Sequence, residues 1–141
     1  MKKLLWAAMA AAFICGTAAG IGDGQAAEAA GASRQFDQCM DKAAATVDMN
    51  DCYGDELKRL DARLNKAYKG LMGRIDADGK KNLKAAETAW INYRNAAARD
   101  FEVSGGTMDS LTANDIYLRI TAERVLLLEK RLKDLDRKSV V

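Results

Sequence analysis

Two cysteines, Cys39 and Cys52, have the residue type and spacing to form one disulfide bond. In an oxidising compartment an isolated cysteine pair is most simply a disulfide, and closing a loop of this size contributes on the order of 3 kcal/mol of stability. The Cys-x-x-Cys spacing of redox enzymes is absent from this pair. No histidine and no further cysteine outside the N-terminal segment is available to complete a metal site, so we expect no metal.

Acid–base catalysis has few candidate residues in this chain. Histidine is absent from all 141 residues, which removes the most common general base and metal ligand. Acidic pairs occur, as in Asp55 with Glu56 and Asp134 with Asp136, but paired acids on a solvated helix are ordinary. We therefore expect no catalytic residues, no cofactor and no enzymatic activity.

Two arginines, Arg94 and Arg124, fall inside apolar stripes of predicted helices. An unpaired arginine in a helix interface costs several kcal/mol, so each guanidinium requires a partner. We expect Asp61 to accept hydrogen bonds from one or both arginines, with Asn65 and Tyr68 completing the network. The alternative for Asp61 is an ordinary solvated helix acid.

Four helices are predicted to position these side chains. The chain has no proline and is rich in alanine, which favours helix, and the apolar periodicity predicts helices at about 36–45, 49–75, 80–103 and 111–136. They predict an all-α fold: an antiparallel bundle of three long helices plus one short N-terminal helix, pinned by one disulfide. Residues 131–138 are expected to fray.

Apolar residues at helical spacing define the faces of the three long helices. The second helix carries Leu57, Leu60, Leu64, Ala67, Leu71 and Ile75. The third carries Leu83, Ala86, Trp90, Tyr93, Ala97 and Phe101, with Arg94 inside the stripe. The last helix has a broader face, with Ile116, Ile120 and Leu127 in one row and Leu118, Thr121, Val125, Leu128, Leu132 and Leu135 in the other. We expect this last helix to contact two neighbours.

A glycine-rich segment, 104–110, separates the last two predicted helices. Its small and polar residues are Ser104, Gly105, Gly106, Thr107 and Ser110. One interpretation is a flexible connector, and the other is a protruding loop whose backbone can enter a partner's cleft. It is not a phosphate-binding loop, because the preceding strand and the Lys-Ser/Thr signature are missing.

The N-terminus has the pattern of a Sec-type signal peptide, residues 1–19, with Lys2 and Lys3 before a short apolar run. A membrane anchor is the alternative, but the run is shorter than the roughly 20 residues that span a bilayer. We expect a disordered leader at 20–34, a helical domain at 35–137, and a periplasmic or secreted protein with no membrane span after cleavage. Losing two lysines leaves 22 − 2 = 20 basic residues against 20 acidic ones, so nucleic acid is not an expected partner.

Several short motifs together are similar to a known family. They are Cys39-Met40-Asp41, Thr46, Met49-Asn50, Cys52, Asp61, Leu64-Asn65, Tyr68, Leu71, Trp90, Tyr93-Arg94-Asn95, Gly105-Gly106-Thr107, Ile120-Thr121 and Arg124. Their order and spacing, from about residue 35 to 132, resemble the secreted LprI-type lysozyme-inhibitor domain family. The resemblance implies a helical exported bacterial domain, and it implies that Asp61, Asn65, Tyr68, Trp90, Arg94, Thr121 and Arg124 are signature positions.

The chain differs from many members of that family, which carry a second cysteine pair where Ala98 and Ile116 fall here. The resemblance implies an exported non-enzymatic protein-binding domain whose partner is a lysozyme. Lysozyme works with two carboxylates in a cleft, so an inhibitor needs a slim protrusion that presents hydrogen-bond donors. The 104–110 segment is the candidate. The alternative is a periplasmic interaction module that binds another envelope protein or component.

Overall fold

The computed structural model describes residues 32–102 and 104–138 of the chain. These residues form four helices and no strand: α2 (Arg34–Met40), α3 (Thr46–Met72), α4 (Ala77–Asp100) and α5 (Thr107–Lys138). The predicted all-α fold of three long helices and one short one is confirmed. The expected signal peptide and residues 20–31 of the expected leader lie outside the described residues.

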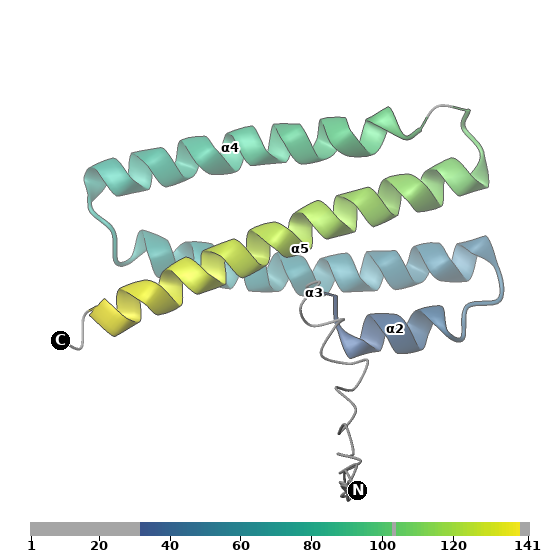
Figure 1. Ribbon diagram of the computed structural model, residues 1–141, viewed down its shortest axis with the longest axis horizontal. Helices are drawn as coiled ribbons and strands as arrows, with labels where there is room; N and C mark the ends of the chain where they lie inside the picture. Colours follow the sequence, from purple (N-terminus) through teal and green to yellow (C-terminus); the bar gives the residue numbers. More distant parts are fainter. Residues whose placement is uncertain (1–31, 103, 139–141) are drawn as a thin grey trace, which may run out of the picture.

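Consecutive long helices run antiparallel, so α3 and α5 run in the same direction and α4 in the opposite one (Figure 1). Helix α5 lies between the other two. It packs against both α3 and α4, as its broad apolar face predicted, whereas α3 and α4 make little contact with each other. The short helix α2 packs on the first half of α3. Helix α5 therefore holds the bundle together.

Two groups of buried side chains form the core, one after the other along α3 and α5. One joins α3 to the first half of α5 and consists of Tyr53, Leu60, Leu118, Ala122 and Val125. The other joins all three long helices near the α3–α4 turn and consists of Ala67, Leu71, Leu83 and Leu128. Full burial of one leucine contributes roughly 1.5–3 kcal/mol, so these residues supply much of the driving force. The predicted stripe of α3 is confirmed, with Leu57, Leu64 and Ile75 partly buried beside its buried members.

The face that α4 buries is rotated from the predicted stripe. Leu83, Arg94 and Ala98 are buried, whereas Tyr93 is 61% exposed and Phe101 is also exposed. Alanine dominates this helix and contributes little hydrophobic contrast, so periodicity alone placed the stripe about one residue position away from the true contact line. In α5, Leu127 of the predicted row with Ile116 and Ile120 is likewise exposed.

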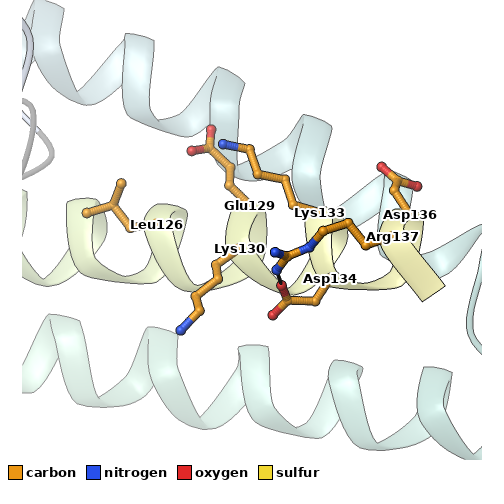
Figure 2. Close-up of a pocket in the computed structure, with 7 residues that line it drawn as sticks. All are labelled: Leu126, Glu129, Lys130, Lys133, Asp134, Asp136 and Arg137. Atoms are coloured by element: carbon orange, nitrogen blue, oxygen red, sulfur yellow. Dashed lines mark hydrogen bonds and ion pairs between the residues drawn. The ribbon is translucent and has the colours of Figure 1, made fainter.

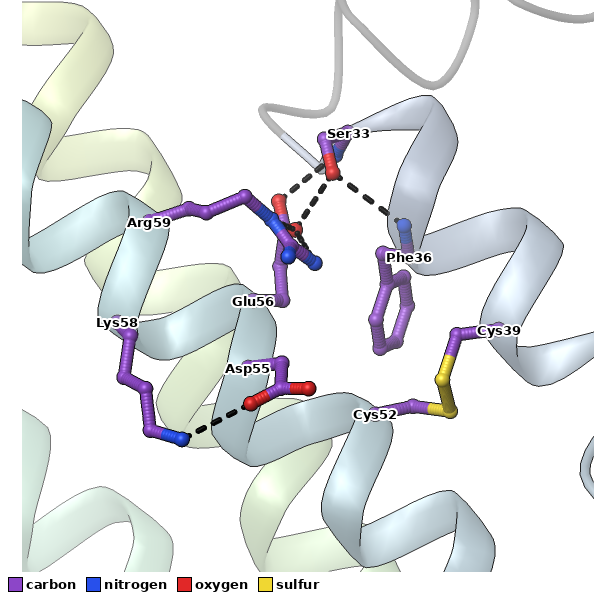
Figure 3. Close-up of polar contacts among 8 residues, drawn as sticks. All are labelled: Ser33, Phe36, Cys39, Cys52, Asp55, Glu56, Lys58 and Arg59. Carbon is purple, nitrogen blue, oxygen red and sulfur yellow. Dashed lines mark hydrogen bonds and ion pairs between the residues drawn. A yellow bond between two sulfur atoms is a disulfide. The ribbon is translucent and has the colours of Figure 1, made fainter.

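The junction of α2 and α3 is fixed by a disulfide and by a buried carboxylate (Figure 3). Cys39 and Cys52 are bonded, with their Cα atoms 5.7 Å apart, as predicted. The Glu56 carboxylate is 1% exposed and accepts from the backbone N–H of Ser33 (2.7 Å) and from its hydroxyl (2.6 Å). Arg59 donates to the same carboxylate at 2.7 Å. Glu56 is thus buried and not a solvated acid, and Ser33, which is expected in the disordered leader, is the N-cap of α2.

Helix ends differ from the predicted ends where polar side chains satisfy terminal backbone groups. The Asp48 carboxylate accepts from Ala44 and Ala45 N–H groups, so α3 begins at Thr46 and residues 46–48, between the first two predicted helices, are helical. Asp76 is the N-cap of α4, and its side chain accepts a hydrogen bond from the Gly79 N–H at 2.8 Å.

Helix α5 is longer than predicted at both ends. It begins at Thr107, four residues before the predicted start at residue 111, and the Thr112 hydroxyl donates to the Met108 carbonyl oxygen at 3.0 Å within the helix. It continues to Lys138, and its last turns are held by an Arg74–Asp136 ion pair at 3.0 Å and by an Arg137–Asp134 pair. Across the described ranges, no helix has the length and apolar character needed to cross a membrane.

Candidate protein-binding site

Arg94 lies in the α4–α5 interface without a carboxylate partner among the described residues. Its guanidinium carbon is 4.6 Å from the ring centroid of Trp90 and 4.0 Å from that of Tyr117. Its Nη1 donates to the Thr121 hydroxyl at 3.3 Å, and Nε is buried with no hydrogen-bond partner in the described chain. The side chain is 9% exposed. Two aromatic faces therefore replace the expected anion, since ring quadrupoles attract a cation.

Arg124 has a carboxylate partner, but it is Glu87 of α4. The Arg124 Nε and Nη2 atoms both donate to Glu87 Oε1, at 3.0 Å and 2.5 Å. The two side chains are 14% and 12% exposed, so water screens their attraction little. The pair ties the middle of α5 to α4.

The predicted pairing of Asp61 with either arginine is wrong. Asp61 is exposed and makes no side-chain ion pair within the described ranges, and its carbonyl oxygen accepts from Asn65 Nδ2 at 2.9 Å. Tyr68 packs against the second core group and not against the arginines. Helix α5 separates α3 from α4, so an acid on the outer face of α3 cannot reach Arg94. Of the seven predicted core residues, the structure brings together Trp90, Arg94 and Thr121, and places Arg124 one turn further along α5.

The ion pair that links α3 to α5 was not predicted. Arg63 donates from Nε and Nη2 to the two carboxylate oxygens of Glu129, at 3.0 Å and 2.8 Å. These hydrogen bonds lower the pKa of Glu129 and raise that of Arg63. The sequence could not predict the pairing of residues 63 and 129, because the register of α3 against α5 is a tertiary property.

The phenol of Tyr53 also has a shifted pKa. Burial, followed by the nearby Asp115 charge, raises the pKa of the Tyr53 phenol above 10.0.

The α4–α5 loop is ordered by one carboxylate. The Ser104 N–H and hydroxyl donate to Asp109 Oδ2 at 2.6 Å and 2.7 Å. Gly105 has φ +72°, a backbone conformation that favours glycine, and no heavy atom lies within 4 Å of a Cβ built there. Both hydrogen-bond donors of Ser104 therefore bond to Asp109 and not to groups outside the loop. Thr107 begins α5 and is exposed, while Ser110 lies in the first turns of the helix.

Exposed apolar side chains gather at the same end of the bundle. We define the loop end as residues 41–51 and 99–109, which contain the α2–α3 turn and the α4–α5 loop (Figure 1). Val47, Phe101 and Met108 are exposed there, three of the six exposed large apolar side chains in the described ranges. An Asn114–Asn50 hydrogen bond of 2.8 Å shows that α5 and α3 begin side by side. Such side chains cost free energy in water and are typical of protein contacts.

Charge is distributed unequally along the bundle. The loop end holds Asp41, Asp48, Asp51, Asp100, Glu102 and Asp109 against Lys42 and Arg99, which gives 2 − 6 = −4. We define the turn end as residues 66–81 and 127–138, where the α3–α4 turn meets the end of α5. It holds ten basic and five acidic residues, which gives 10 − 5 = +5. A chain of nearly zero net charge is thus strongly polarised.

A shallow hollow on the second half of α5 is a weaker candidate site (Figure 2). It is lined by Leu126, Glu129, Lys130, Lys133, Asp134, Asp136 and Arg137. Its three basic and three acidic residues balance, and Asp134 and Arg137 pair with each other across it. The described part of the chain holds no group of three or more His, Cys, Asp or Glu side chains placed to bind a metal ion.

These features define a disulfide-linked, antiparallel helical domain with an ordered loop between its last two helices. The chain belongs to the family described as lysozyme inhibitor LprI, whose model matches residues 39–128. That match spans α3, α4, the α4–α5 loop and most of α5, and it confirms the resemblance that the sequence motifs indicated.

One relative is an uncharacterized protein of Rhizobium meliloti (strain 1021), which is 26% identical over 67% of this chain and 79% of its own length. No solved structure matched the chain.

Proposed function

We propose that this protein is exported, loses residues 1–19, and acts without enzymatic chemistry as a lysozyme inhibitor that binds through the loop end. The observation that carries the proposal is the family match across residues 39–128, which includes the α4–α5 loop. The ordered loop, with Ser104, Gly105, Gly106, Thr107 and Ser110, is the proposed contact. The exposed side chains of Phe101 and Met108 flank it.

Residues 104–109 suit a cleft because contacts within the loop restrain them before binding. Its backbone conformation at Gly105 and the two hydrogen bonds to Asp109 lower the entropy lost on docking. Ser104 is not a free donor, so contacts to a partner come from the Thr107 hydroxyl, from exposed backbone and from the apolar side chains. The Asp109 carboxylate also places negative charge at the start of α5, which disfavours insertion of the loop directly against a pair of ionised acids.

The test is inhibition by purified residues 20–141 against a panel of lysozymes that spans basic and acidic isoelectric points. We expect stoichiometric inhibition of at least one lysozyme. Inactivity against the whole panel would refute lysozyme inhibition and favour binding of another envelope protein or component.

A matched pair of glycine variants tests the role of the loop. Gly105→Ala forces a β-carbon into a positive-φ conformation at a cost of about 1–2 kcal/mol. At Gly106 the added β-carbon meets only the Ser104 hydroxyl oxygen, at 3.6 Å. We expect Gly105→Ala to weaken inhibition by about tenfold and Gly106→Ala by less than about twofold. Equal inhibition by both variants would exclude the loop as the contact.

A further inference from the structure

The acidic charge of the loop end exceeds what helix stability explains. Asp48 and Asp109 lie in the first turns of α3 and α5, where negative charge is favoured by the helix dipole. Asp100 and Glu102 lie at the carboxyl end of α4, where the dipole disfavours negative charge, and both are exposed. At the opposite end of α4, Asp76 and Asp78 suit the dipole, whereas Lys80 and Lys81 oppose it. Arg99 in the last turn suits the dipole, so it offsets only part of the local cost of Asp100 and Glu102.

Each exposed apolar side chain of the loop end has an acidic neighbour in the sequence, and acids outnumber bases there by six to two. Phe101 lies between Asp100 and Glu102, Met108 precedes Asp109, and Val47 precedes Asp48. An apolar contact with a charged rim is the usual anatomy of a transient protein interface. A rim in which one sign predominates favours a partner surface of the opposite sign and accelerates its encounter.

We propose that the loop end binds a basic protein surface, one in which lysine and arginine side chains surround an apolar contact. This inference rests on the proposed function and adds to it the chemistry of the partner: among lysozymes, the basic ones are the targets. The neutral mature chain has no overall attraction for such a protein, but its separated charges orient it so that the loop end leads the encounter.

The experiment compares two double charge reversals that change net charge equally. Asp100→Lys with Glu102→Lys reverses the α4 side of the loop end. Asp61→Lys with Glu123→Lys is the control, because both acids are exposed on helix surfaces outside the loop end and make no ion pair within the described ranges. Binding to the most basic lysozyme of the panel is measured by calorimetry, at about 20 mM and about 500 mM salt, and circular dichroism checks the fold of each variant.

We expect the loop-end reversal to weaken binding at least tenfold at low salt and the control to stay within about twofold. Raising the salt concentration should weaken wild-type binding and leave the loop-end variant nearly unchanged, because exposed charges beyond about 10 Å are screened at 0.1 M. Undiminished binding by the loop-end reversal would overturn the inference and leave the proposed function standing. Binding that follows this pattern without inhibition of any lysozyme in the panel would support the inference and refute the proposed function. The absence of binding to every basic lysozyme would overturn the inference, and it would leave the proposed function standing only if an acidic lysozyme is inhibited.

The apolar contact is tested separately. Met108→Ser removes an exposed side chain from the loop end, whereas Leu127→Ser removes one of comparable exposure from the turn end. We expect Met108→Ser to weaken binding several-fold at both salt concentrations, because apolar burial is not screened by salt. Equal effects of the two substitutions would place the contact elsewhere.

Discussion

Arg94 is a positive charge that the interior holds between two aromatic rings. Trp90 precedes it by one turn on α4 and Tyr117 approaches from α5, so the guanidinium also joins the two helices. A desolvated cation–π contact contributes up to about 2 kcal/mol. This arrangement explains how α4 tolerates a charge at the centre of its buried face.

Arg94→Ala should lower the free energy of unfolding by about 2 kcal/mol, because both ring contacts and the Thr121 hydrogen bond are lost. Urea denaturation followed by circular dichroism measures the change. The effect should be independent of salt, since no ion pair is broken. An unchanged midpoint would show that the rings do not stabilise the guanidinium.

A double-mutant cycle on Glu87 and Arg124 tests the second interior arginine. Removing either partner leaves a mostly buried charge unpaired and should cost about 3 kcal/mol, and the double substitution to alanine should cost less than the sum of the singles. Asp61→Asn is the control and should change stability by less than about 0.5 kcal/mol. Additive single effects would contradict the pairing.

Sequence periodicity found that Arg94 and Arg124 point inward but assigned them the wrong partner. Periodicity gives the face of a helix, whereas the partner depends on which helices are neighbours. Because α5 lies between α3 and α4, Asp61 on α3 cannot reach Arg94, and Glu87 on α4 is the acid that pairs with Arg124. No feature of the sequence indicated that Tyr117 would make a cation–π contact with Arg94.

At the scale of elements, α2 is too short to be a stable helix alone and depends on its links to α3. Those links are the Cys39–Cys52 disulfide, the Ser33–Glu56 hydrogen bonds and the Phe36–Tyr53 contact, with ring centroids 5.2 Å apart. The sequence predicted the disulfide because Cys39 and Cys52 are the only two cysteines outside the N-terminal segment, so they can pair only with each other. It missed Glu56, since a buried acid and a solvated one look alike in a helical sequence.

Replacing both Cys39 and Cys52 with serine should lower the free energy of unfolding by roughly 3 kcal/mol in the loop-entropy account. Guanidinium denaturation of the variant and of the oxidised parent gives the difference. Reduction of the parent should reproduce the same loss. A variant as stable as the parent would show that α2 is held without the bond.

The Arg63–Glu129 pair makes part of the α3–α5 contact sensitive to acid. Its hydrogen bonds lower the pKa of Glu129 in the folded state, so its contribution is present above the unfolded pKa near 4.5 and is lost as pH falls through the folded value. Both side chains are partly exposed, so the contribution is below about 1 kcal/mol. Glu129→Gln should be less stable than the parent at pH 7, and the difference should disappear as pH falls below the folded pKa, as measured by urea denaturation over a series of pH values. A difference that persists at low pH would contradict an electrostatic origin.

At the scale of the whole molecule, the bundle separates its charges along its length. The loop end carries −4 and the turn end +5, while α5 connects the two and supplies contacts to both neighbours. The order of elements and the antiparallel bundle could be predicted from the sequence, because each long helix has an apolar face and each connection is short. The separation of charge between the loop end and the turn end could not be predicted. The net charge of the chain is close to zero, and the separation becomes visible only when the directions of the helices are known.

Hydrogen–deuterium exchange of the protein with a basic lysozyme would locate the contact directly. The chain contains no proline, so every backbone amide that follows the first residue can report. We expect slower exchange on complex formation at residues 41–51 and 99–109, with residues 66–81 and 127–138 unchanged. Protection confined to the second half of α5, or no protection at all in an inhibited complex, would contradict binding through the loop end.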